Sequence, residues 1–355
     1  MKKIFRILLY GLFILVGAVL VQFAYNEYRA NRLDQPYDGN TLSSEDLTTL
    51  KELRSFKDQY GGLIWPGFDR ENIPVVLFND RYEFMANVGS NPDGWKRVGE
   101  SDSSAVNYYR RQAKDPQAFA VQTQVGWAGR FTTLNRLNRR LLLNLRRDIP
   151  VPLNKLMPSQ MILKDNDYHM VALVHEMFHA HQANQAPEKF AASNSLAPLT
   201  DQYPYHRDSL NHLFSQEGKY LVAALETDSI AEKKRLCRKF LQTRHQRREQ
   251  LPSQMVKFEK HYEWLEGLAK YAEVQAYKVA LDHRESLSLD YQEGMPHWQT
   301  DRKNLRGLGR VDGSTRFYLS GMAQARLLDQ IAGKWKKQAM TQDVYLEGLI
   351  RQVLK

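Results

Sequence analysis

The feature that most constrains this chain is a polar motif inside a strongly apolar run. Residues 171–179 read Val-Ala-Leu-Val-His-Glu-Met-Phe-His, so that His175 and His179 stand four residues apart with Glu176 beside the first. Burying two imidazoles and a carboxylate in such a run is costly unless partners compensate them. The run therefore predicts a buried helix whose polar side chains share a partner.

The spacing of the two histidines indicates a metal ion as that partner. On a helix, residues i and i+4 lie about 40° apart with a rise of about 6 Å, so both imidazoles can reach one ion. Zinc binds two neutral imidazoles and one carboxylate and keeps a fourth position for water. Glu176 can accept a proton from that water without being a ligand. The motif predicts one Zn²⁺ per chain, bound by His175 and His179, with Glu176 as the general base.

A third ligand is expected from a second helical segment. Residues 263–273 read Glu-Trp-Leu-Glu-Gly-Leu-Ala-Lys-Tyr-Ala-Glu, which places Glu263, Glu266 and Glu273 on roughly one face of a core-like helix. Gly267 leaves room for another backbone or side chain to come close. Glu266 is the preferred third ligand, and a solvated helix face is the alternative for any of these glutamates.

Together the two segments resemble the paired motif of the gluzincin metallopeptidases, the clan that includes thermolysin and the zinc aminopeptidases. The stretch 264–271 is similar to the aminopeptidase pattern Trp-Leu-Asn-Glu-Gly-Phe-Ala, in which the Glu binds zinc, but the Asn is missing here. The resemblance implies a zinc peptidase with His175, His179 and Glu266 as ligands and Glu176 as the base. The 86 residues between His179 and Glu266 are far more than the clan usually has, and predict two inserted helices.

The same resemblance implies two further statements about the site. Gluzincins use a Tyr or His to stabilise the tetrahedral oxyanion, and Tyr318, near the start of an apolar helix after a Gly-rich loop, is the candidate. A purely structural role is the alternative, since the chain has 18 tyrosines. The chain has no Gly-x-Met-Glu-Asn run, so the resemblance does not extend to aminopeptidase activity.

The N-terminus predicts an uncleaved membrane anchor. Lys2, Lys3 and Arg6 precede an uncharged apolar run of nineteen residues, 7–25. Such a run roughly matches the hydrocarbon core of a bilayer. A cleaved signal peptide is the alternative, although Gln-Phe-Ala at 22–24 is a poor cleavage site. Basic residues before the run predict a cytoplasmic N-terminus, with the main domain in the periplasm or outside the cell.

The predicted fold class is α+β. We expect a transmembrane helix in 1–26, a linker and helix in 27–62, a small α/β subdomain with a twisted sheet in 63–165, and a mainly helical, zincin-like half in 166–355; residues 63–355 would form one catalytic unit. The expected helices are 43–60, 132–147, 167–184, 206–225, 228–248, 253–282, 315–332 and 341–354. The expected strands are 73–78, 82–85, 118–125 and 161–163, with the alternating pattern of 118–125 interrupted at 126–129.

Composition limits the partners. The net charge of +10 favours anionic surroundings, but the Lys and Arg residues are interleaved with 40 acidic ones, and no zinc finger or RNP motif is present, so we expect no nucleic-acid partner. The most basic stretch, 233–248, predicts a solvated helix face, with contact to anionic lipid as the alternative. Cys237, the single cysteine, excludes an intrachain disulfide and is expected in the core.

These features predict a membrane-anchored zinc peptidase that hydrolyses peptide bonds in a peptide or protein substrate. Two alternatives remain open at this point. The same site could serve a metallohydrolase with a non-peptide substrate, or the chain could be a non-catalytic tethered scaffold with a structural metal. The sequence indicates no oligomeric state.

Overall fold

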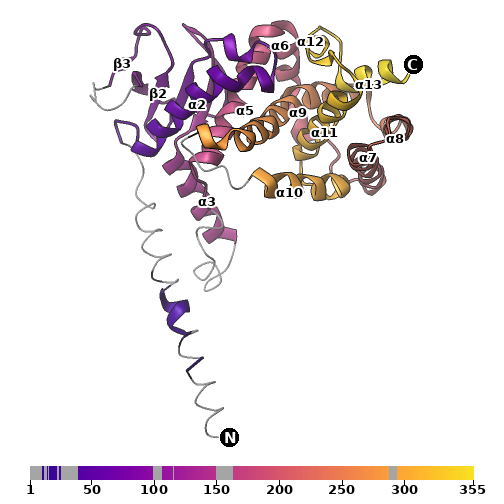
Figure 1. Ribbon diagram of the computed structural model, residues 1–355, viewed down its shortest axis with the longest axis horizontal. Helices are drawn as coiled ribbons and strands as arrows, with labels where there is room; N and C mark the ends of the chain where they lie inside the picture. The colour runs from indigo at the N-terminus through magenta and orange to yellow at the C-terminus, as the bar shows by residue number, and fades with distance from the viewer. Residues whose placement is uncertain are drawn as a thin grey trace, which may run out of the picture. The chain divides into compact units, whose positions relative to one another are not determined.

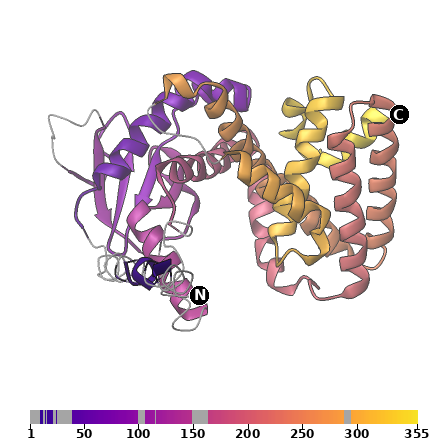
Figure 2. The same cartoon turned by 60° about the horizontal axis from the view of Figure 1, so that its bottom comes forward.

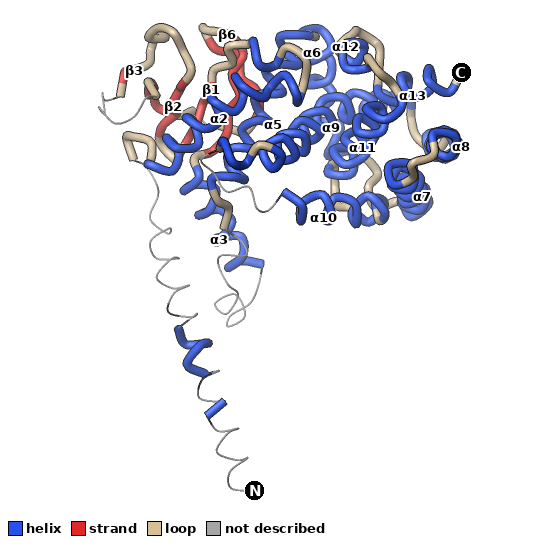
Figure 3. The backbone as a smooth tube through the Cα atoms, viewed as in Figure 1, coloured by secondary structure: helices blue, strands red, loops and turns tan. Residues whose placement is uncertain are grey.

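The computed structural model describes residues 39–98, 106–114, 116–148, 163–287 and 294–355, and a few positions between 10 and 24 (Figure 1). The chain divides into two compact units. Unit 1 comprises residues 1–50, 76–118 and 131–169, and unit 2 comprises 51–75, 119–130 and 170–355. The architecture is mixed α and β, which agrees with the predicted α+β class (Figure 3). Its one six-stranded sheet has the strand order β3-β4-β2-β1-β6-β5.

Unit 1 is built around four strands and a helix. They are β1 (Val75–Phe78), β2 (Tyr82–Ala86), β3 (Lys96–Arg97), β4 (Tyr108–Gln112) and α3 (Leu134–Asp148). The predicted turn at Asn79 is confirmed, because its Oδ1 accepts hydrogen bonds from the backbone N–H groups of Arg81 and Tyr82 at 2.9 and 2.7 Å. This turn joins two strands whose apolar residues are buried.

Strands β3 and β4 were not predicted. The sequence of β4, Tyr-Tyr-Arg-Arg-Gln, lacks the apolar alternation of a buried strand. It pairs antiparallel with β2, and Arg111 lies opposite Glu83, where the two side chains form a 2.7 Å ion pair. A cross-strand ion pair therefore replaces the apolar pattern by which β4 would have been recognised.

In unit 2, β5 (Phe119–Thr123) and β6 (Gly126–Thr132, of which 126–130 belong to this unit) form an antiparallel hairpin. The prediction that the strand pattern is interrupted at 126–129 is wrong, because these residues belong to β6. Gly126 has φ +110° at the turn, which favours glycine. A Cβ at Gly129 would lie 2.6 Å from the backbone N of Met177, so this glycine lets β6 pack directly against the helix that carries His175.

The rest of unit 2 is helical (Figure 2). Helix α2 (Ser44–Ile64) enters from unit 1, as α5 (Asn166–Gln185) does. The others are α6 (Pro187–Leu196), α7 (Asp208–Glu226), α8 (Ile230–Arg248), α9 (Ser253–Asp282), α10 (Gly294–Arg306), α11 (Thr315–Ile331), α12 (Trp335–Ala339) and α13 (Leu346–Leu354), with short 3₁₀ turns at Phe68–Arg70, Ala197–Gln202, Arg284–Ser286 and Leu308–Arg310. The most extensive helix contacts join α9 to α11 and α7 to α8.

Most predicted helices are confirmed to within a few residues, and the differences have local causes. Helix α6 was read as a loop because of Pro187, but this proline occupies the first turn, where its missing N–H costs nothing. Helix α10 was also missed. The segment expected as one helix over 341–354 is a turn followed by α13, which begins at Leu346. Of the strand predicted at 161–163, residues 161 and 162 lie outside the described residues.

Helices α9 and α11 touch through glycine. A Cβ at Gly267 of α9 would lie 2.5 Å from the Cα of Gly321 in α11, and a Cβ at Gly321 would lie 2.4 Å from the carbonyl oxygen of Glu263. The expectation that Gly267 allows a close approach is confirmed. The contact matters for the site because Glu266 and Tyr318 lie on these two helices.

The basic stretch 233–248 was expected to face solvent, and for Lys233 and the last three arginines this is wrong. Arg244, Arg247 and Arg248 are buried, and each pairs with buried carboxylates. Arg244 donates to Glu263 at 2.7 and 2.8 Å. The acidic partners, spread over α7, α9 and α13, are Glu217, Glu259, Glu263 and Glu347. Charge compensation between helices explains how such a basic segment is buried.

Two other expectations concern single segments. Cys237 is buried, as predicted. Among helices in the described part of the chain, none is both long and apolar enough to cross a bilayer. Most of the predicted anchor over 1–26 lies outside the described residues; Tyr10, Gly11, Ile14, 16–21 and Ala24 are described, and they are helical.

Candidate metal centre

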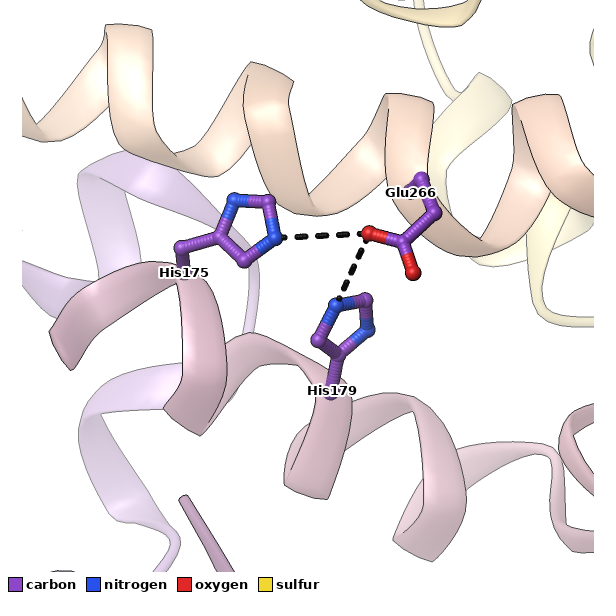
Figure 4. A group of neighbouring side chains, drawn as sticks. All are labelled: His175, His179 and Glu266. Atoms are coloured by element: carbon purple, nitrogen blue, oxygen red, sulfur yellow. Dashed lines mark ion pairs between the residues drawn. The ribbon is translucent and has the colours of Figure 1, made fainter. Parts of the chain in front are cut away.

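Two helices of unit 2 bring the predicted ligands together. His175 and His179 project from α5, and Glu266 projects toward them from α9 (Figure 4). The Oε2 atom of Glu266 lies 3.5 Å from Nε2 of His175 and 3.3 Å from Nε2 of His179. All three residues are largely shielded from solvent, and their donor atoms lie within 4.8 Å of one another.

These distances fit a metal ion. Ligand atoms bound tetrahedrally to one zinc at about 2.0–2.1 Å lie roughly 3.3 Å apart. The two distances to Glu266 match this edge length. Two imidazole nitrogens and one carboxylate oxygen also form a donor set that leaves a coordination position free. Two of the three distances between the ligand atoms therefore match tetrahedral coordination, and the group could bind a metal ion.

Each histidine is held at its other ring nitrogen. Nδ1 of His175 lies 3.4 Å from Oε2 of Glu273, seven residues after Glu266 on α9. Nδ1 of His179 lies 2.9 Å from Oε1 of Gln182, and the amide of Gln182 donates to the carbonyl oxygens of Trp264 and Leu265 at 2.8 and 3.2 Å. Such outer contacts fix the ring orientation and leave Nε2 for the ion.

The charges around the histidines favour a cation. Burial lowers the pKa of His175, but its contacts with Glu266 and Glu273 outweigh this and raise the pKa to about 10. Burial opposes ionisation of Glu273, yet Lys270 and His175 hold its pKa down to about 2. The pKa of Glu266 is also lowered, against the effect of burial, by the two histidines. The carboxylates thus stay ionised and stabilise positive charge at this position.

Glu176 differs from the other carboxylates. It is 8% exposed, and its Oε2 has no hydrogen-bond partner among the described residues. Burial raises the pKa of this carboxyl to about 7, although His175 and His179 oppose the shift. A carboxyl with a pKa near neutrality can both accept and return a proton, which is what a general base requires.

Tyr318 also lies at this centre. Its ring stacks on His175 with centroids 6.1 Å apart and an interplanar angle of 13°. Burial, the charge of Glu266 and hydrogen bonds to Glu266 and Tyr262 raise the pKa of Tyr318, so its hydroxyl keeps its proton. A protonated phenol beside the ligands can donate a hydrogen bond to an anionic oxygen.

One strand borders the site. Phe119, the first residue of β5, places its ring 4.6 Å from that of His179 and stacks on Phe190 of α6 at 5.7 Å. The ring of Phe119 lies against His179, which is 1% exposed, and such burial strengthens electrostatic interactions.

The structure brings all five predicted site residues together: His175, Glu176, His179, Glu266 and Tyr318. Glu263 does not join them. It lies about 60° from Glu266 around α9 and pairs with Arg244 instead. His181 was expected to be a core or loop histidine, and it is buried against Glu71 at 2.9 Å. The role of Gln182 was missed, and its one sequence signal was a polar residue one turn after His179 inside an apolar helix.

Comparisons with known proteins add no assignment. The chain matches no family model, no curated protein and no solved structure.

Proposed function

We propose that this chain is a zinc-dependent peptidase of the gluzincin type. One observation carries the proposal: two histidines and a glutamate converge at ligand distance beside the buried carboxyl of Glu176, whose Oε2 has no hydrogen-bond partner among the described residues. A structural zinc site would not need that carboxyl, because in such sites protein ligands occupy all four coordination positions and no water is activated. Peptide as the substrate rests on the resemblance of 264–271 to the peptidase pattern.

The proposed chemistry assigns a role to each side chain. When bound, zinc would supply Lewis-acid chemistry, polarising a carbonyl and lowering the pKa of a water molecule. Glu176 would accept the proton of the attacking water and pass it to the leaving amine. Tyr318 would donate a hydrogen bond to the oxygen that becomes negative in the transition state. His175, His179 and Glu266 would hold the ion.

Substitution of Glu176 tests the proposal. Glu176→Gln should keep zinc, because Glu176 is not a ligand, and should lower peptide hydrolysis by about a hundredfold or more. His175→Ala should lose both zinc and activity. The measurements are zinc per chain by atomic emission and cleavage of a panel of peptides and esters.

The outcomes separate the alternatives. Unchanged hydrolysis by Glu176→Gln would refute the mechanism. Hydrolysis of esters but not peptides would indicate a metallohydrolase of another substrate class. Bound zinc without any hydrolysis would indicate a structural metal in a scaffold protein.

We also propose that residues 7–25 anchor the chain in a bilayer with the metal centre outside the cytoplasm. The support is their uncharged, apolar sequence after three basic residues. The full chain should sediment with membranes and resist carbonate extraction, whereas a chain starting at residue 27 should not sediment. Equal sedimentation of both would contradict the anchor.

A further inference from the structure

A pocket of about 700 Å³ lies in unit 2 on the side of α11 that faces α7. Its wall includes one face of α7, with Asn211 and Ser215, and the segment around Gly309. Gly309 makes this wall possible, because a Cβ there would lie 1.8 Å from the carbonyl oxygen of Asn211. The N–H of Gly309 donates to Ser215 Oγ at 3.2 Å. The backbone of the segment around Gly309 and the backbone of α7 therefore touch along this wall of the pocket.

The inner wall of this pocket carries a buried arginine without a carboxylate. Arg316 is 2% exposed and donates only to neutral acceptors, Oδ1 of Asn211 and the carbonyl oxygen of Val311, each at 2.9 Å. No ion pair to Arg316 occurs among the described residues, and its Nε has no hydrogen-bond partner there. A buried cation in such surroundings is unfavourable unless a counter-ion is supplied.

Two other buried arginines of the same unit, Arg244 and Arg247, are each paired with glutamates. The pKa of Arg244 and that of Arg247 are raised, because glutamates outweigh the effect of burial. For Arg316, burial lowers the pKa; electrostatic interactions with Tyr203, Tyr205 and Asp312 offset only part of this, and the charge of Arg247 adds to the lowering. Arg316 thus lacks a counter-ion that this fold supplies to arginines elsewhere.

Other side chains on the pocket wall add positive charge. Lys219 and Arg310 line it, and neither forms an ion pair in the part of the chain that the structure describes. Two carboxylates, Asp208 and Asp312, line it as well, but both are exposed, so solvent screens them more than the buried guanidinium. The buried end of the pocket is therefore the end that favours an anion.

We propose that this pocket binds an oxyanion, a phosphate or carboxylate group, with Arg316 as its counter-ion. Arg310 and Lys219 stand at the exposed side and attract the ligand. The site is separate from the candidate metal centre and does not depend on the proposed peptidase activity. Because Arg316 and Tyr318 lie two residues apart on α11, they face different sides of that helix.

Calorimetric titration of the full chain with inorganic phosphate, and separately with succinate, tests the proposal at constant ionic strength. We expect saturable binding of one anion per chain. Replacing both exposed cations, Arg310→Gln with Lys219→Gln, should weaken binding by about tenfold or more, since charge-assisted hydrogen bonds are lost. Arg316→Gln should abolish it. Preference for phosphate over succinate, or the reverse, identifies the ligand class.

The matched control removes two exposed charges elsewhere, Arg238→Gln with Lys239→Gln on α8, and should leave the affinity within about twofold. His175→Ala should also bind normally, which excludes binding at the candidate metal centre. The proposal is overturned if neither anion binds saturably, or if the pocket and control double variants bind equally. If Arg316→Gln fails to fold by circular dichroism, the pocket double variant decides.

Discussion

At the scale of single residues, the candidate metal centre depends as much on side chains behind the ligands as on the ligands themselves. Gln182 holds Nδ1 of His179 and is bound through its amide to two carbonyl groups of α9. It therefore fixes the imidazole and ties α5 to α9 at the same place. Glu273 likewise holds Nδ1 of His175 and so fixes the orientation of its ring.

This arrangement predicts that Gln182→Leu weakens zinc binding by roughly 10- to 100-fold, the usual effect of losing an outer hydrogen bond to a ligand histidine. Competition with a chromophoric chelator measures the affinity. Gln242→Leu, on the exposed side of α8, is the matched control and should bind zinc as the unmodified chain does. Equal affinities for the two variants would mean that Gln182 does not position His179.

The candidate site residues that could be predicted from the sequence are those whose positions follow from local spacing. His175, Glu176 and His179 follow from a single helical turn, and Glu266 from a carboxylate in an apolar helix beside a glycine. The partner of each Nδ1 atom did not follow, because it depends on how α5 and α9 cross. For the same reason Glu263 was grouped with Glu266, although a rotation of 60° directs it to Arg244.

At the scale of elements, the crossing of α9 and α11 sets the position of Glu266 relative to Tyr318. The two helices meet at Gly267 and Gly321, where their backbones leave no space for a side chain. Helix α5 has a similar contact with β6 at Gly129, next to Glu176. The elements that carry the site therefore pack backbone to backbone beside it.

Gly267→Ala should accordingly force α9 and α11 apart. We expect a loss of about 1–3 kcal/mol in the free energy of unfolding, which is typical of overpacking, together with weaker zinc binding. Urea denaturation measures the first quantity. Gly348→Ala in α13 is the control, because a Cβ there meets no atom within 4 Å; it should be neutral or stabilising by up to ~1 kcal/mol. A Gly267→Ala protein as stable as this control would contradict the close packing.

Long periodic elements were predictable because their apolar faces are read from the sequence alone. This explains the agreement for α7 and α11. Helices α5 and α9 are buried on nearly all sides, and their long, mainly apolar sequences indicated them instead. Elements defined by a partner were not predictable: β4 is held by the pairing of Arg111 with Glu83, and β6 contains Gly129, which packing against α5 requires.

At the scale of the whole molecule, the largest unexpected feature is the buried network of three arginines and four glutamates in unit 2. It connects α7, α8, α9 and α13, and Ser320 of α11 joins it by donating to Glu263 at 2.6 Å. Arg244 is at its centre, in contact with Glu217, Glu263 and Glu347. The network fixes the helices behind the candidate metal centre.

Arg244→Met should destabilise unit 2 by about 3–5 kcal/mol, because it leaves buried carboxylates without their cation. Thermal unfolding followed by circular dichroism measures the loss. Arg235→Met removes an equally charged side chain whose partner, Glu232, is exposed on the same helix, and it should leave unfolding unchanged. A small effect of Arg244→Met would show that the network can rearrange around the missing charge.

The bridge that Gln182 makes between α5 and α9 has a consequence for how such sites are recognised. It joins two segments that are neighbours in space but separated by α6, α7 and α8 along the chain. The number of residues between His179 and Glu266 thus depends on the route that the backbone takes between α5 and α9. It does not determine the geometry of the metal-ligand atoms. Insertions there can lengthen the interval without changing the ion's surroundings. A search that fixes this interval would overlook the centre, whereas one that requires only the two short helical patterns would find it.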